Sequence, residues 1–250
     1  MIEIRNLTFT YPDGTVAFES VDLSIPPGSI FLVCGPNGSG KSSLLKAMAG
    51  LLKPQQGEIT VTGCPDEGKK GKLKSPTFGL VFQNPEHQIL GETVKEDVSL
   101  GLKYMGLPEQ EIEKRVFEAL EFCNLLHLAE KPCHLLSGGE KKRLSIASVL
   151  AMKPRVFLLD EPFANLDYPS TRSVLDCLIR LNREGHTLVV ATHDLDVVAP
   201  YATALAILNN GRVACVSHRP EELFPGLEKY GVRPPCYALY GLRPAARIMS

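Results

Sequence analysis

The chain lacks any apolar run close to the length that crosses a lipid bilayer. A membrane-spanning helix needs about 20 consecutive apolar residues, and no stretch of this sequence approaches that length. The amino terminus also lacks the pattern of a signal peptide, because the strand-like residues 2–9 begin almost at once. We therefore expect a chain that forms no pore itself, so that any channel it serves must be another polypeptide.

The chain also lacks an excess of charge of either sign. The 27 Lys and Arg residues and 28 Asp and Glu residues leave a net charge of −1. Affinity for nucleic acid rests largely on a basic surface, so we expect no nucleic-acid partner. The lysines at 69, 70, 72 and 74 alternate with Gly68 and Gly71, which is typical of a solvated loop.

The seven cysteines lack any paired or C-x-x-C spacing. This scatter disfavours both a disulfide framework and a zinc site, and it favours reduced thiols. Cys34 ends an apolar run, where we expect it to be buried as a small hydrophobic residue. An isolated His87 lacks the ligand cluster that a metal site needs.

A glycine-rich segment follows the strand-like run of residues 30–34 and precedes a predicted helix from Ser42 to about Gly50. It matches the pattern G-x-x-x-x-G-K-[ST], whose backbone N–H groups surround the phosphates of a nucleotide. The alternative is a glycine-rich turn that only caps a helix, but the strand and helix on either side favour the phosphate site. The predicted nucleotide-binding residues are Gly35, Pro36, Asn37, Gly38, Ser39, Gly40, Lys41, Ser42 and Ser43.

Two side chains of this segment have specific expected roles. Lys41 can reach the β- and γ-phosphates, and the Ser42 hydroxyl is placed to bind Mg²⁺. Such a segment occurs in small-molecule kinases, GTPases and transport ATPases alike. Other motifs must therefore separate these classes.

A second motif, which is acidic, follows the apolar run of residues 156–159, and this run is typical of a buried parallel strand. Asp160 is expected to hold Mg²⁺, and Glu161 to orient the attacking water or take its proton. Taken alone, an acidic pair at a strand end is often a helix cap or a solvated turn. The phosphate-binding segment makes the catalytic interpretation the stronger one.

The family is indicated by Leu136-Ser137-Gly138-Gly139-Glu140, which opens a predicted helix through Leu150. The chain here resembles the signature of the ABC (ATP-binding cassette) ATPases. The resemblance implies that Ser137, Gly138, Gly139 and Glu140 of one subunit cover the γ-phosphate held by a second subunit. It also implies two equivalent, active ATP sites in a head-to-tail dimer, with ATP and Mg²⁺ as cofactors.

Four further positions match the ABC pattern one by one. Tyr11 matches the aromatic residue that stacks on adenine, and Gln83 matches the glutamine that touches Mg²⁺ and the attacking water. Asp167 matches the aspartate that communicates across the dimer; without the resemblance it is a helix N-cap. His193 matches the histidine that hydrogen-bonds the γ-phosphate; otherwise it belongs to a strand-to-helix corner that Asp194 caps. The resemblance thus assigns Glu161, His193, Gln83 and Lys41 to catalysis.

The expected fold is the α/β P-loop NTPase fold of ABC ATPases, in a single domain of residues 1–250. It implies a mostly parallel sheet with strands near 78, 156, 187 and 204, and an antiparallel amino-terminal β subdomain up to about residue 62. A helical subdomain is expected over about 84–150, where residues 112, 116, 119, 120 and 123 recur at helical spacing after Pro108. Residues of about 226–250 form a tail without clear periodicity.

The segment Phe82-Gln83-Asn84-Pro85 with Gln88 resembles the F-Q-N-P-x-x-Q block of the energy-coupling factor ATPases, and residues 191–196 resemble the block of their cobalt and nickel members. This implies a peripheral protein at the cytoplasmic face of the membrane, with a transmembrane coupling protein and a substrate-capture membrane protein as partners. The expected cargo is cobalt or nickel ions, or a vitamin such as biotin. The second ATPase subunit is an identical or a related chain. Another ABC importer or exporter ATPase, or a soluble ABC ATPase acting on nucleic acid, is the alternative.

Overall fold

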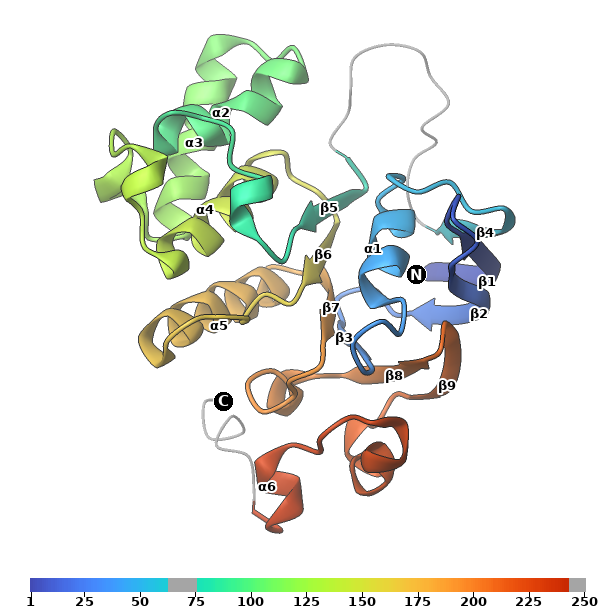
Figure 1. Cartoon of the computed structure of the whole chain (residues 1–250). Helices are drawn as coiled ribbons and strands as arrows, with labels where there is room; N and C mark the ends of the chain where they lie inside the picture. The colour runs from blue at the N-terminus through green and yellow to red at the C-terminus, as the bar shows by residue number, and fades with distance from the viewer. Residues whose placement is uncertain (63–75, 243–250) are drawn as a thin grey trace.

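The computed structural model describes residues 1–62 and 76–242, and these form two β-sheets with helices packed around them (Figure 1). The predicted solvated loop of lysines 69, 70, 72 and 74 lies outside the described residues. A three-stranded antiparallel sheet has the order β2-β1-β4, with bounds Ile2–Thr10 for β1, Val16–Ile25 for β2 and Gln56–Val61 for β4. The predicted antiparallel amino-terminal sheet is therefore confirmed.

The larger sheet has six strands in the order β5-β6-β7-β3-β8-β9. The first five are parallel, and β9 is antiparallel to β8. The bounds are Ile30–Cys34 for β3, Phe78–Val81 for β5, Val156–Asp160 for β6, Thr187–Thr192 for β7, Ala204–Asn209 for β8 and Arg212–Ser217 for β9. The sequence predicted a mostly parallel sheet with β5, β6, β7 and β8, but not the edge strand β9.

The parallel strands are buried on both faces because each face meets a different layer. One face packs with α1 (Lys41–Met48) and the antiparallel sheet, through side chains such as Phe31, Val33 and Leu158. The other face packs with α4 (Gly138–Ala151) and α5 (Tyr168–Arg183), through Leu32, Phe157 and Leu159. Successive strand residues point to opposite faces, so the sheet separates two hydrophobic cores.

Helices α2 (Val94–Tyr104), α3 (Glu109–Phe122) and α4 form a group at the upper left of Figure 1, away from the antiparallel sheet. The predicted apolar face of α3 is buried, with Ile112, Val116 and Leu120 each no more than 4% exposed. Cys34 is also fully buried, as expected. None of the helices in the two described ranges is both long and apolar enough to cross a membrane.

The described part of the tail has more structure than its sequence predicted. Short 3₁₀ segments at Pro220–Glu222 and Phe224–Tyr230 precede the one-turn helix α6 (Cys236–Leu239). Phe224 and Leu227 are buried against the core that contains α4 and α5. Other 3₁₀ turns span Pro85–His87, Leu126–Leu128, Cys133–Leu135 and Ala199–Tyr201.

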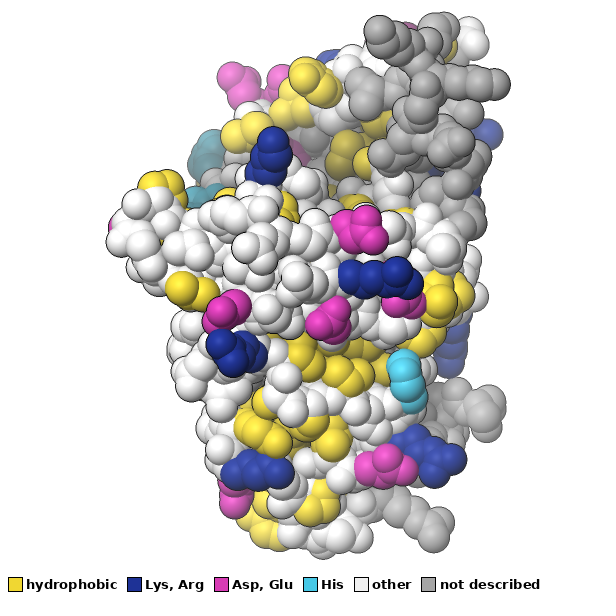
Figure 2. Space-filling model, turned by 90° about the vertical axis from the view of Figure 1, so that its right-hand side faces the viewer, with side chains coloured by type: hydrophobic (Ala, Val, Ile, Leu, Met, Phe, Trp, Pro, Cys, Tyr) yellow, Lys and Arg dark blue, Asp and Glu magenta, His cyan; other side chains and the backbone are white. Residues whose placement is uncertain are grey.

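The face at the right-hand side of Figure 1 carries charges of both signs. Figure 2 shows Lys and Arg side chains intermingled with Asp and Glu side chains across that face. Between β9 and β2, Arg212 Nη2 lies 2.7 Å from Glu19 Oε2. Such exposed pairs add little to the free energy of unfolding.

Candidate nucleotide site

The glycine-rich segment forms a tight loop between the carboxyl end of β3 and the start of α1. Its last glycine, Gly40, has a φ of 100°, and a Cβ atom there would lie 2.2 Å from the Ala17 carbonyl oxygen. Only glycine fits this close approach and this backbone conformation. The Lys41 side chain folds back into the loop, where Nζ donates hydrogen bonds to the carbonyls of Gly35 (2.7 Å) and Pro36 (2.9 Å).

The loop contains donors that no described group satisfies. Ser39 is 2% exposed, yet its Oγ has no hydrogen-bond partner among the described residues. Helix α1 also begins without a side-chain cap, which leaves its first N–H groups free for an anion. A buried unsatisfied hydroxyl is costly, so the loop fits the phosphates of a nucleotide.

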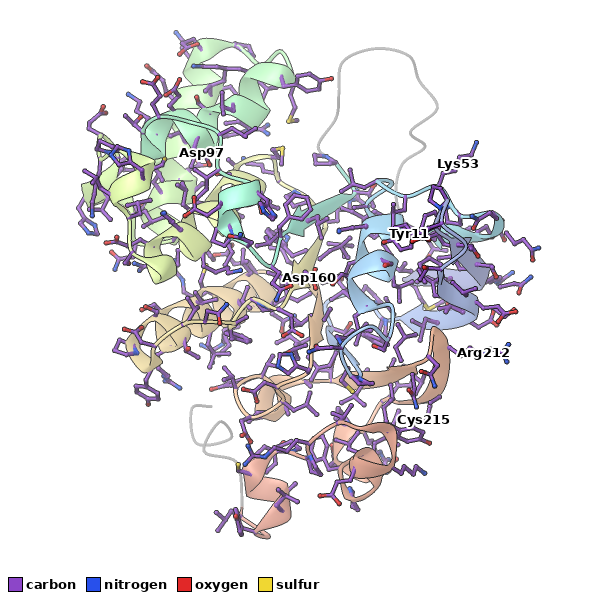
Figure 3. All side chains as sticks on the ribbon, in the orientation of Figure 1. Tyr11, Lys53, Asp97, Asp160, Arg212 and Cys215 are labelled. Atoms are coloured by element: carbon purple, nitrogen blue, oxygen red, sulfur yellow. The ribbon has the colours of Figure 1, made fainter. Side chains whose placement is uncertain are left out.

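Ser42, in the first turn of α1, meets Asp160, the last residue of β6, and Figure 3 shows Asp160 near the centre of the molecule. Ser42 Oγ donates a 2.9 Å hydrogen bond to Asp160 Oδ1. Burial raises the pKa of the Asp160 carboxyl, and the hydrogen bond from Ser42 partly opposes this shift. Burial lowers the pKa of Lys41, while the charges of Glu161 and Asp160 raise it. A hydroxyl and a carboxylate are oxygen ligands of the kind that Mg²⁺ prefers, so these two side chains fit that ion.

Glu161 follows directly and is held in a defined orientation. Its backbone has a φ of 43°, and its side chain is 9% exposed. Oε1 accepts hydrogen bonds from the His193 backbone N–H (3.0 Å) and lies 2.7 Å from His193 Nδ1, while Oε2 accepts one from Thr192 Oγ1 (3.0 Å). The sequence predicted Glu161 and His193 but not Thr192, which only the pairing of β6 with β7 brings alongside.

Tyr11 lies just beyond β1, next to the loop. Its hydroxyl is 2.9 Å from Ser43 Oγ at the start of α1, and its ring meets the Phe9 ring edge-on at 5.0 Å between centroids. The side chain is only partly buried. An aromatic face is therefore available beside the predicted phosphate site.

Gln83 is exposed and follows β5 by two residues. Its backbone carbonyl accepts a 2.5 Å hydrogen bond from Lys142 Nζ on α4. The side chain of Gln88, which the sequence marked as distinctive, accepts from Phe82 N–H and donates to the Ser145 carbonyl. Gln88 therefore fastens the loop after β5 onto α4.

The signature segment forms the start of α4, as predicted. Ser137 is the N-cap: its Oγ accepts from Glu140 N–H, and Glu140 Oε2 accepts from Ser137 N–H at 2.7 Å. Gly139 is required by packing, because a Cβ atom there would lie 2.4 Å from Ser170 Oγ on α5. Asp167 caps α5 by accepting from Ser170 N–H at 3.0 Å.

The structure thus gathers one group of predicted residues and keeps a second group apart. Lys41, Ser42, Asp160, Glu161 and His193 meet at the carboxyl ends of β3, β6 and β7. The signature residues begin a helix packed on the sheet face opposite α1. The predicted alternative for Asp194 is wrong, because no helix begins there and its carboxylate accepts instead from the Asp196 N–H.

Three functional candidates were not predicted, namely Thr192, Lys142 and Asp97. Lys142 is 1% exposed and Asp97 is 5% exposed. A signal for Lys142 exists in the sequence, because it lies four residues before Ile146 on the buried face of α4. No comparable pattern marks Asp97.

In a comparison with known proteins, residues 18–164 match the family model described as ABC transporter. The chain is 41% identical to the energy-coupling factor transporter ATP-binding protein EcfA of Methanocaldococcus jannaschii, over 91% of this chain and 82% of that protein. It is 40% identical to EcfA3 of Clostridium perfringens, over 90% of this chain and 79% of that protein.

Solved structures show the same similarity. Against cbiO1 of Clostridium perfringens, described as part of the ABC transporter complex cbiONQ, the TM-score is 0.78 with 40% identity over 91% of this chain and 92% of that one. Against the ATP-binding cassette MJ0796, solved as a dimer bound to ADP and Pi after hydrolysis, it is 0.75 with 31% identity. That alignment covers 88% of this chain and 99% of that one.

Proposed function

Because this chain belongs to the ABC transporter ATPases, and among them is related to the energy-coupling factor ATP-binding proteins, we propose that it drives uptake of a micronutrient by hydrolysing ATP on the cytoplasmic face of a membrane. Its cargo is cobalt or nickel ions, or a vitamin such as biotin. The observation that best supports ATP hydrolysis is that Ser42, Asp160 and Glu161 meet beside the Lys41 loop.

The assigned chemistry follows from the positions of these groups. Lys41 neutralises charge on the phosphates, once it leaves the carbonyls of Gly35 and Pro36. Ser42, Asp160 and Gln83 would hold Mg²⁺, which would supply electrostatic stabilisation of the phosphate oxygens. Glu161 takes the proton of the attacking water. His193, whose Nδ1 lies 2.7 Å from Glu161 Oε1, reports whether the γ-phosphate is present.

A second ATPase chain completes each site in this proposal. Within one chain the signature helix α4 packs on the sheet face opposite α1. The hydrogen bonds of the Ser137 cap stay inside α4, and its hydroxyl end is exposed. A partner that presents Ser137, Gly138 and Gly139 to the loop of the first chain supplies the missing donors. Asp167 lies near this segment, because it caps α5 through Ser170, which packs against Gly139. Tyr11 stacks on the adenine.

The membrane partner in this proposal is a transmembrane coupling protein, which works with a substrate-capture membrane protein. A groove of about 470 Å³ lies beside the loop after β5, lined by Glu86, Ile89, Leu90, Gly91, Glu92, Thr93, Pro132, Cys133 and His134. Leu90 is 80% exposed at this groove. An open groove with an apolar wall and acidic rim suits an amphipathic helix that carries basic residues.

The proposal is tested by coexpressing the chain with such a coupling protein and a capture protein in vesicles. We expect ATP-dependent uptake of one of the named cargoes, lost in the Glu161→Gln variant although the complex still assembles. ATP hydrolysis without assembly on any coupling protein would contradict the proposal.

Charge reversal at the groove gives a sharper test. Glu86 is exposed and forms an ion pair with Lys141. Glu86→Lys should reduce copurification of the coupling protein by on the order of tenfold, because like charges now face a basic helix. Basal ATP hydrolysis should change little, because the lost Glu86–Lys141 pair is exposed and the bonds of Lys142 and Gln88 to the loop remain. Glu121→Lys, on the exposed side of α3, is the matched control. Equal loss of hydrolysis and copurification would instead indicate a folding defect.

A further inference from the structure

Lys142 is one of the largest fully buried side chains of the described residues, although lysine is normally exposed. It projects from the first turns of α4, and its Nζ donates to the carbonyl oxygens of Phe82 (3.1 Å) and Gln83 (2.5 Å). These two carbonyls are the first after β5 ends at Val81. Burial of the amine is costly, so its two hydrogen bonds must offset that cost.

Other side chains fasten the middle of the same loop to the same helix. Gln88 Oε1 accepts from Phe82 N–H at 3.0 Å, and Gln88 Nε2 donates to the Ser145 carbonyl at 3.2 Å. Lys141, next to Lys142, pairs with Glu86. The loop therefore has three independent attachments to the first two turns of α4.

The far end of the loop is held by Asp97, which Figure 3 shows among the helices at the upper left. Asp97 Oδ1 accepts from the N–H groups of Leu90 (2.8 Å) and Gly91 (3.0 Å), and Oδ2 accepts from Ser148 Oγ of α4 (2.7 Å). Gly91 approaches so closely that a Cβ atom would lie 2.4 Å from the Asp97 nitrogen. Both ends of the loop are thus tied to α4, one directly and one through Asp97.

We propose that Lys142 is a positioning residue, which fixes the backbone of Gln83 to the signature helix so that residues 82–91 and α4 move as one body. This proposal rests on the function proposed above for Gln83 and Ser137. A displacement of the loop by a membrane partner then displaces Ser137 at the start of α4. In the opposite direction, docking of Ser137 on a partner's nucleotide displaces the groove that contains Glu86.

The attachment is specific to a long side chain with several donors. A lysine ammonium carries three hydrogens and can serve both carbonyls at once, and hydrogen bonds from a charged donor are stronger than neutral ones. Methionine has nearly the same length and shape but no donor. Lys142→Met therefore removes the two hydrogen bonds and keeps most of the packing.

The test combines amide hydrogen exchange with steady-state ATP hydrolysis on the isolated full chain. In Lys142→Met we expect the amides of residues 82–91 to exchange about tenfold faster or more, with those of the Gly35–Ser43 loop unchanged. The kcat should fall by about tenfold while KM for ATP stays within about twofold. Lys142→Arg, which retains the donors, should recover part of the kcat. Ile146→Val, also buried on α4 but without a bond to the loop, controls for loss of stability.

A double-variant comparison separates positioning from mere stability. If Lys142 acts through Gln83, then Lys142→Met should have little further effect on kcat in a Gln83→Ala background. Effects that multiply in the double variant, or unchanged loop exchange in Lys142→Met, would overturn the proposal. Neither readout requires a coupling protein, so failure of the proposed uptake function would be seen separately, in the vesicle experiment.

Discussion

At the scale of single residues, the carboxylate of Glu161 is restrained from several directions. Its backbone lies in the left-handed region, and its oxygens are held by Thr192 Oγ1 and by two nitrogens of His193. Strained backbone at a buried polar side chain is typical of functional sites. Glu161 is therefore preorganised before a nucleotide binds.

We expect Glu161→Gln to lower kcat by on the order of 10² to 10⁴, because an amide cannot take the proton of the attacking water. The affinity for ATP should be retained, since glutamine keeps the shape of the side chain and its Oε1 still accepts from the His193 N–H, while the Thr192 hydroxyl donates to the Asp194 carbonyl. Turnover by phosphate release and affinity by equilibrium nucleotide binding check the two parts. Unchanged turnover would remove Glu161 from the role of base.

Motif residues could be predicted because they follow one another in the chain. The segment of residues 35–43 and the pair Asp160-Glu161 each lie at one strand end, so their local order places them. Thr192 and Lys142 reach their partners across 31 and 60 positions. Such contacts depend on strand order and helix packing, which no local pattern contains.

At the scale of elements, the start of α4 shows how a short motif determines a helix end. Ser137 and Glu140 satisfy each other's N–H groups in a capping box. The hydrogen bond from the Ser137 backbone is the main cause that holds the pKa of Glu140 below its usual range, and the charge of Lys131 adds to it. The sequence predicted this helix start because all of its signals lie within four residues.

The lowered pKa gives a pH dependence with a definite sign. In the folded chain Glu140 keeps its charge at a pH where the same residue of the unfolded chain already takes up a proton. Its contribution to the free energy of unfolding is therefore fully present above a pH of about 4.5, and it is lost as the pH falls through the pKa of the folded state. Wild type should thus lose more stability than Glu140→Gln between pH 6 and pH 3. Denaturant unfolding at each pH measures this difference.

Glu130→Gln serves as the matched control for Glu140→Gln, because it removes one exposed carboxylate without touching the Ser137 cap. Its stability should follow the pH profile of wild type. Parallel profiles for wild type and both variants would contradict the assigned role of the cap.

Elements without a buried face were the hardest to predict. Strand β9 contains the short apolar run of residues 213–216, but its side chains alternate between exposed and partly buried, so the run does not have the burial of a central strand. It lies at the edge of the six-stranded sheet, where it pairs with β8. By contrast, every residue of β3, β6 and β7 is buried, and these apolar runs were recognisable.

At the scale of the whole molecule, the sheet divides the chemistry between two layers. Helix α1 and the phosphate loop lie with the antiparallel sheet on one face, and the signature helix lies with α2, α3 and α5 on the other. Because each chain presents both halves in separate places, a second chain is the simplest way to join them. This dependence on a second chain is the central claim.

The most direct measurement is ATP hydrolysis by mixed dimers of two inactive variants. Lys41→Ala removes the phosphate contact of one chain, and Ser137→Arg blocks the signature of the other. Each variant alone should be nearly inactive, whereas a mixture contains dimers with one composite site of two wild-type halves, so hydrolysis should return to a substantial fraction of the wild-type rate. Mixed dimers that form, as shown by copurification of differently tagged chains, but recover no hydrolysis would contradict the account.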